Sequence, residues 1–141
     1  MSAAILAVDV GTVRIGVACC AGLGLPALAL TTLQHRSREK DIYAIVDLAR
    51  ERGAQTIVVG YPLRLDSRRG PAALKMDRFI AALRAAFDGD VVAVDERMTS
   101  ALAARKLRET GASGAARREL VDRFAAVEIL ESYLARKARE A

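Results

Sequence analysis

The chain has 141 residues, 52% of them hydrophobic and 28% charged, with a formal net charge of +5. This length fits one domain over 1–141, and so large an apolar share excludes a chain that is disordered throughout. No apolar run approaches the roughly 18 residues of a membrane span, and the N-terminus lacks a signal-peptide pattern, so we expect a cytoplasmic protein with no membrane partner. The basic balance favours an anionic partner, nucleic acid first.

The first part of the chain predicts three strands. Apolar runs at 5–10 and 14–20 are joined by a very short link, which favours an antiparallel hairpin because a parallel return needs a crossover of a dozen or more residues. A third strand is expected at 27–33, after a break rich in Gly and Pro. Cys19 and Cys20 are adjacent and show no zinc spacing, so we expect reduced cysteines that belong to the core.

The rest of the chain predicts strands alternating with helices. Ser37 is placed to cap a helix over 38–52, and the residues expected on its buried face are Ile42, Ile45, Val46 and Ala49. A strand at 56–59 precedes a helix over 72–87, whose apolar residues near helical spacing are Leu74, Phe79, Ile80 and Leu83. A strand at 91–94 and two helices, at 99–110 and 115–139, complete the prediction.

This order of elements predicts an α/β fold. An antiparallel half built on a hairpin precedes strands that alternate with helices. We therefore expect a mixed five-stranded sheet, antiparallel in its first three strands and then parallel, flanked by helices.

Two of the predicted strands end in acidic residues. Asp9 lies near the carboxyl end of the first strand, and Asp95 and Glu96 lie at the carboxyl end of the last. In parallel and mixed α/β sheets the carboxyl ends of strands are where sites form. These acids are therefore candidates for chemistry.

A third acid, Asp122, lies in the final predicted helix. At about 100° per residue, it shares a face with Ala126, Ile129 and Tyr133. The opposite side carries Leu120, Phe124, Val127 and Leu134, so this helix is expected to be apolar nearly all round and substantially buried. A carboxylate on a buried helix needs a partner, which Arg118 one turn earlier could supply, or a metal ion.

Three carboxylates from separate elements suit hard divalent cations, which prefer oxygen ligands. Two such ions about 3.5–4 Å apart can clamp the attacking and leaving oxygens of a phosphodiester. This site would need no His or Cys, and the one histidine, His35, falls in a polar segment where we expect a surface residue. The sequence contains no phosphate-binding loop of the Walker or dinucleotide type.

Four motifs together resemble the YqgF (RuvX) family. They are AVDVGTVRIGVA (7–18), IVVGYPL (57–63), VDERMTS (94–100) and VDRFAAVEILESYL (121–134). The resemblance covers essentially the whole chain. It implies an RNase H-like fold and an enzyme of one of two kinds, a pre-16S rRNA nuclease or a Holliday junction resolvase.

By this resemblance, Asp9, Glu96 and Asp122 are the catalytic residues and the ligands of Mg²⁺ or Mn²⁺. Asp95 is the alternative acid, but neighbouring side chains on a strand point to opposite faces, which makes Glu96 the preferred ligand. Many RNase H-like nucleases keep an acid at the end of the fourth strand, whereas this strand ends in Gly60-Tyr61-Pro62. Whether one or two metal ions bind is left open.

We expect nucleic acid to contact the hairpin turn and several arginines. These residues are Gly11, Thr12, Arg14, Arg64, Arg68, Arg69 and Arg97. The expected partners are pre-rRNA or branched DNA, with ribosomal particles as a further possibility, and the protein is a monomer or a homodimer.

Two rival functions are compatible with parts of the sequence. The DVGT segment also resembles the phosphate hairpin of sugar kinases and actin-like ATPases, but those enzymes need two such cores, and one fills this chain. A nonenzymatic RNA-binding or ribosome-binding module is the other alternative. Within the nuclease interpretation, maturation of the pre-16S 5′ end is placed first and junction resolution second.

Overall fold

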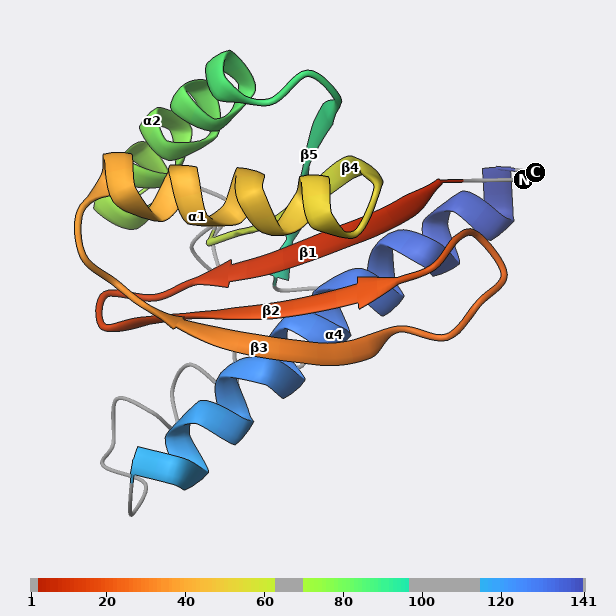
Figure 1. The fold of residues 1–141 in the computed structure, drawn as a ribbon, viewed down its shortest axis with the longest axis horizontal. Helices are drawn as coiled ribbons and strands as arrows, with labels where there is room; N and C mark the ends of the chain where they lie inside the picture. The colour runs from red at the N-terminus through yellow and green to blue at the C-terminus, as the bar shows by residue number, and fades with distance from the viewer. Residues whose placement is uncertain (1–2, 63–69, 97–114, 141) are drawn as a thin grey trace.

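A five-stranded mixed sheet forms the centre of the protein (Figure 1). The computed structural model describes residues 3–62, 70–96 and 115–140, and in the last range it describes side chains from residue 121 onward. The strands are β1 (Ala4–Val10), β2 (Arg14–Cys20), β3 (Leu28–Gln34), β4 (Ala54–Tyr61) and β5 (Asp90–Asp95). Their order is β3-β2-β1-β4-β5. The β1–β2 and β2–β3 pairs are antiparallel and the β1–β4 and β4–β5 pairs are parallel, which confirms the predicted sheet.

Helices cover both faces of this sheet. α1 (Arg38–Glu51) and α2 (Pro71–Ala86) lie on one face, and α4 (Ala115–Glu140) runs across the other (Figure 1). Ser37 caps α1 as expected, because its side chain accepts a hydrogen bond from the Lys40 N–H at 3.2 Å. The helix predicted at 99–110 lies outside the described residues.

The strands divide their side chains between two apolar clusters, as the period of two requires. Alternate residues of β1 such as Leu6 and Val8 pack with α1 and α2, and the buried face of α1 is the predicted one, with Ile42, Ile45, Val46 and Ala49. The residues between them, such as Ile5 and Ala7, pack with α4. Cys20 joins the α4 cluster and Cys19 packs against the other, and both are free thiols.

Two details of the predicted helices are wrong. Leu74 is 51% exposed, because it lies on the outer side of α2, whereas Phe79, Ile80 and Leu83 face the sheet. Phe124 is 59% exposed, so α4 buries one broad face and leaves the other open to solvent. α4 is an amphipathic covering helix rather than one surrounded by protein.

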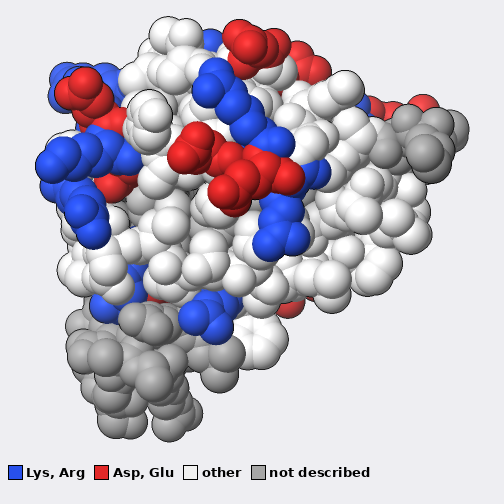
Figure 2. Space-filling model, in the orientation of Figure 1, with Lys and Arg blue, Asp and Glu red and all other residues white. Residues whose placement is uncertain are grey.

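Charges of both signs are mixed on the surface. In the view of Figure 2, Lys and Arg side chains lie among Asp and Glu and form no continuous basic field. No helix among the described residues is long and apolar enough to cross a membrane.

Candidate nuclease site

Asp9 lies near the carboxyl end of β1 and faces α4. It follows Ile5 and Ala7 in the alternation of the strand, and both of those residues belong to the cluster beneath α4. Only 2% of Asp9 is exposed, although its side chain is a carboxyl group. The neighbour Val10 points the other way and packs against the α1 and α2 cluster.

A glycine on one side of Asp9 lets α4 approach the sheet. Asp9 pairs with Gly16 across the β1–β2 hairpin. A β-carbon added at Gly16 would overlap the backbone carbonyl oxygen of Asp122. The absence of a side chain at Gly16 therefore brings the segment of α4 that carries Asp122 beside Asp9.

A second glycine on the other side of Asp9 makes room for Glu96. The parallel pairing of Val8 with Val59 places Gly60 beside Asp9 at the next position. A β-carbon added at Gly60 would lie 3.5 Å from Oε2 of Glu96 and 2.6 Å from Cδ1 of Ile129. β4, the strand that lacks the acid kept by many RNase H-like nucleases, thus has no side chain at Gly60. The carboxylate of Glu96, which follows β5, extends over Gly60.

The same geometry distinguishes Glu96 from Asp95. Glu96 is completely buried, and its carboxylate lies at Gly60 beneath α4. Asp95 pairs with Tyr61 at the edge of the sheet, is partly exposed and lines a hollow with Glu128. The arrangement favours Glu96 as the companion of Asp9.

Asp122 is 3% exposed and shares its buried face with the three predicted residues, Ala126, Ile129 and Tyr133. Its Oδ2 accepts a hydrogen bond from Nε of Arg14 at 2.7 Å, so its charge partner comes from β2. The helical neighbour Arg118 was the partner that spacing suggested, and its side chain lies outside the description. A further bond, from Nε of Arg123 to Oγ1 of Thr32 at 3.1 Å, ties the same turn of α4 to β3.

The predicted nucleic-acid contacts are placed only in part. Gly11 and Thr12 form the turn of the hairpin, where the Gly11 N–H donates to the Arg14 carbonyl at 2.9 Å. A β-carbon on Gly11 would lie 2.6 Å from that same carbonyl oxygen, so the tight turn requires glycine. Thr12 is exposed. Arg64, Arg68, Arg69 and Arg97 lie outside the described residues.

The donor set suits a hard divalent cation, since all three buried side chains are carboxylates on one face of the sheet. Gly60 leaves space beside one of them. Within the described ranges, however, no group of three His, Cys, Asp or Glu side chains is arranged to hold a metal ion. The guanidinium of Arg14 already provides a positive charge at Asp122. The residue types therefore fit a divalent metal ion.

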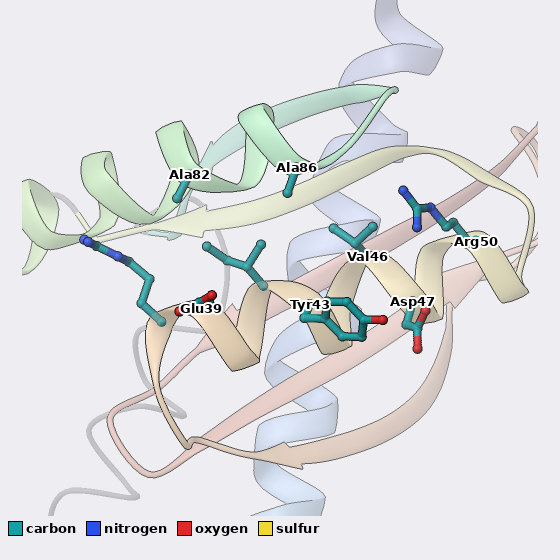
Figure 3. A pocket seen from close by; sticks show the side chains of 9 residues that line it. Glu39, Tyr43, Val46, Asp47, Arg50, Ala82 and Ala86 are labelled. Carbon is teal, nitrogen blue, oxygen red and sulfur yellow. The ribbon is translucent and has the colours of Figure 1, made fainter.

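Two further features lie away from these acids. The first is a pair that sequence reasoning missed: His35 is on the surface as expected, but its Nδ1 contacts Oδ2 of Asp41, which is 4% exposed. The second is a groove of about 410 Å³ between α1 and α2, where Tyr43 and Val46 face Ala82 and Ala86 (Figure 3). This groove lies on the face opposite Asp9 and contains none of the three acids.

Two solved resolvases share this fold. RuvC of T. thermophilus, solved in complex with a Holliday junction substrate, matches with a TM-score of 0.58 at 12% identity, covering 96% of each chain. The fowlpox virus Holliday junction resolvase matches with a TM-score of 0.53 at 13% identity, covering 94% of this chain and 98% of the other. The protein therefore has the RNase H-like fold of RuvC-type resolvases.

The chain belongs to the RuvX family, described as Holliday junction resolvase, whose family model matches residues 3–136. A relative from Syntrophus aciditrophicus (strain SB) is 45% identical over 92% of this chain and 87% of its own length. A relative from Clostridium perfringens (strain SM101 / Type A) is 36% identical over 94% of this chain and 96% of its own length. Both carry the name "Putative pre-16S rRNA nuclease". The family resemblance that the four motifs indicated is confirmed. The names of both relatives are names of nucleases, which are hydrolases.

Proposed function

We propose that this protein is a metal-dependent nuclease that hydrolyses phosphodiester bonds in structured nucleic acid and processes the 5′ end of pre-16S rRNA. The observation that carries the proposal is the burial of Asp9, Glu96 and Asp122 on one face of the sheet, in a chain of the RuvX family. We place its action in the cytoplasm, on pre-rRNA or ribosomal particles, with 1–141 acting as one domain.

In this proposal the three carboxylates hold Mg²⁺ or Mn²⁺. Such an ion, when bound, lowers the pKa of the attacking water and stabilises the leaving oxygen. The protein supplies the negative charge at Asp9 and Glu96, while Arg14 fixes the carboxylate of Asp122. Water adds to phosphorus and the bond to the 3′ oxygen breaks, which leaves a 5′-phosphate and a 3′-hydroxyl.

The turn at Gly11 and Thr12 presents little side-chain bulk beside this site. Gly11 and Thr12 follow Asp9 by two and three positions, just after β1 ends. Gly11 has no side chain, and Thr12 is exposed. A nucleic-acid backbone could therefore approach Asp9 over the turn, with the hydroxyl of the exposed Thr12 as a hydrogen-bond donor.

Junction resolution is the second candidate function. The description of the family and the shared fold of RuvC favour it. A resolvase cuts two strands symmetrically and is usually a two-fold dimer, whereas maturation of an RNA end requires one cut. The names of the relatives with 36–45% identity support rRNA processing, and we therefore propose it first.

The test is a parallel cleavage assay with Mn²⁺ on a pre-16S 5′-leader RNA and a four-way DNA junction. We compare the natural protein with Asp122→Asn and use Asp47→Asn, an exposed acid on α1, as the matched control. We expect cleavage of the leader that Asp122→Asn abolishes and Asp47→Asn preserves. Preferred cleavage of the junction would assign the second function. Binding without cleavage by any variant would refute the nuclease and indicate a nonenzymatic RNA-binding module.

A further inference from the structure

A cavity of about 340 Å³ lies on the face of the sheet opposite the three acids. It opens between the hairpin turn after β1 and the first turns of α1 and α2. Its volume is within the range of small-molecule sites, roughly 300–1,000 Å³. Nothing in the proposed chemistry of the acids uses this cavity.

The lining of this cavity divides into an apolar part and a cationic part. Met76 and Phe79 of α2 are 6% and 5% exposed, and Val10 of β1 is partly buried beside them. Arg38 and Lys75 are exposed, so their charged groups lie where the cavity meets solvent. A ligand that fits both parts has a flat apolar ring at one end and an anionic group at the other.

Two features add to the attraction for an anion. Asp41, the acid in the lining, is buried, accepts a hydrogen bond from the Arg36 N–H at 3.0 Å and contacts Nδ1 of His35. Its charge is therefore directed at those partners, which weakens its repulsion of an anion in the cavity. α2 also begins at this cavity with no side-chain cap and no acid in its first turn, so the positive end of its dipole adds to Arg38 and Lys75.

The cavity and the acids meet at the end of one strand. Val10 lines the cavity, and the preceding residue, Asp9, faces the opposite side of the sheet. Nucleic acid that crosses the hairpin turn could therefore place a phosphodiester at Asp9 and a neighbouring base in the cavity. A base can enter only if it is unpaired, as in single-stranded RNA recognition.

We propose that this cavity binds a nucleoside monophosphate unit, with the base against Met76 and Phe79 and the phosphate at Arg38 and Lys75. The unit is either an unpaired nucleotide of the substrate strand or a free mononucleotide. Only the first alternative rests on the proposed nuclease function. The two sources have the same chemistry and differ in what else is attached to the phosphate.

The test measures binding of 5′-AMP, with adenosine as the probe that lacks the phosphate, by calorimetry in EDTA so that metal ions make no contribution. Lys75→Ala removes a cation from the cavity, and Arg78→Ala removes an exposed cation that lies outside it on the same helix. Ala72→Phe fills the cavity at its exposed edge, and Ala81→Phe adds the same ring elsewhere on α2. Binding of an unpaired RNA oligonucleotide is measured with the same four variants.

We expect saturable binding of 5′-AMP that Lys75→Ala weakens about tenfold and Ala72→Phe abolishes, while both controls stay near the natural protein. Adenosine should bind more weakly than 5′-AMP. If Ala72→Phe also weakens binding of the oligonucleotide, the unit belongs to the substrate, and if only 5′-AMP binding changes, it is a free mononucleotide.

The proposal is overturned if 5′-AMP shows no saturable binding, or if Ala72→Phe and Ala81→Phe bind it equally. Asp9→Asn separates this result from the nuclease proposal. That variant should lose cleavage and keep 5′-AMP binding, because Asp9 faces away from the cavity. Cleavage by a protein that does not bind 5′-AMP would support the nuclease proposal and show that this cavity has no role in it.

Discussion

Arg14 and Asp122 are 108 positions apart in the sequence, yet Nε of Arg14 donates a hydrogen bond to Oδ2 of Asp122 at 2.7 Å. The two side chains are 14% and 4% exposed, so the pair is largely removed from water. It joins the hairpin that carries Asp9 to the helix that completes the set of acids. Arg14 was expected to contact nucleic acid, and in the structure its Nε contacts the carboxylate of Asp122.

We predict that Arg14→Gln lowers the free energy of unfolding by about 2–3 kcal/mol, because Asp122 then keeps its charge in a buried place without the guanidinium. The double variant Arg14→Gln/Asp122→Asn should recover much of this loss, since it no longer buries that charge. Urea unfolding of the four proteins in the cycle measures the coupling. Additive effects of the two substitutions would show that the pair contributes nothing to stability.

We predict that Asp9→Asn leaves the protein without metal ions at least as stable as the natural chain, because it replaces one of several buried carboxyl groups with a neutral amide of similar size. The natural protein should gain thermal stability from Mg²⁺ or Mn²⁺, since a ligand that binds only the folded state stabilises it. Asp9→Asn should lose most of that gain, while Asp47→Asn retains it. Equal melting shifts in all three proteins would contradict a role of Asp9 in holding the ion.

The two glycines beside Asp9 should respond differently to alanine. At Gly16 the new methyl group meets backbone of α4, so the helix must move, and we expect a loss of about 3 kcal/mol or more in the free energy of unfolding. At Gly60 it meets the tip of the Ile129 side chain, which can adjust, and we expect a loss of about 1 kcal/mol.

A second substitution checks the reason for this difference. Ile129→Val shortens the side chain that the new methyl group would meet, so it should offset the cost of Gly60→Ala. It should not help Gly16→Ala, whose conflict is with the Asp122 carbonyl. Chemical denaturation of both double variants decides between these outcomes, and rescue of Gly16→Ala would show that α4 does not depend on this close approach.

Local patterns in the sequence predicted the sheet well. The short hairpin link, the alternation of strands and helices, and the buried face of α1 all depend on residues close together in the chain. The alternation that was used to choose between Asp95 and Glu96 also holds in β1, where Asp9 and Val10 lie on opposite sides.

Contacts between distant segments were harder to predict. Helical spacing suggested Arg118, whose side chain lies outside the described residues. It could not indicate Arg14 of β2, which contacts Asp122 because α4 crosses over the hairpin. The place of Glu96 over Gly60 and the contact of His35 with Asp41 depend in the same way on tertiary packing. Periodicity also could not show that Phe124 is 59% exposed, since an amphipathic helix and a fully buried helix can share similar residues.

The two adjacent cysteines should differ in reactivity. Burial raises the pKa of the Cys20 thiol, an effect that backbone hydrogen bonds at Gly22 and Ile5 oppose. A raised pKa leaves less of the reactive thiolate at a given pH, and Cys20 is also only 2% exposed, whereas Cys19 is partly exposed.

We therefore predict that an alkylating reagent modifies Cys19 of the folded protein at least about tenfold faster than Cys20. The rate at Cys20 should rise as the pH rises toward its elevated pKa. Mass spectrometry of the labelled peptide distinguishes the two positions, and the protein unfolded in urea is the control, in which the rates should become similar. Equal rates in the folded protein would contradict the burial of Cys20.

The carboxylate of Asp122 comes from α4, the last helix described. A chain still attached to the ribosome can expose Asp9 and fold the hairpin early, but the Gly16 contact and the Arg14 pair must wait until α4 has been synthesised and has docked. Asp122 is thus the last of the three acids to be synthesised. Under the proposed function, no cleavage of nearby RNA is expected before α4 has docked.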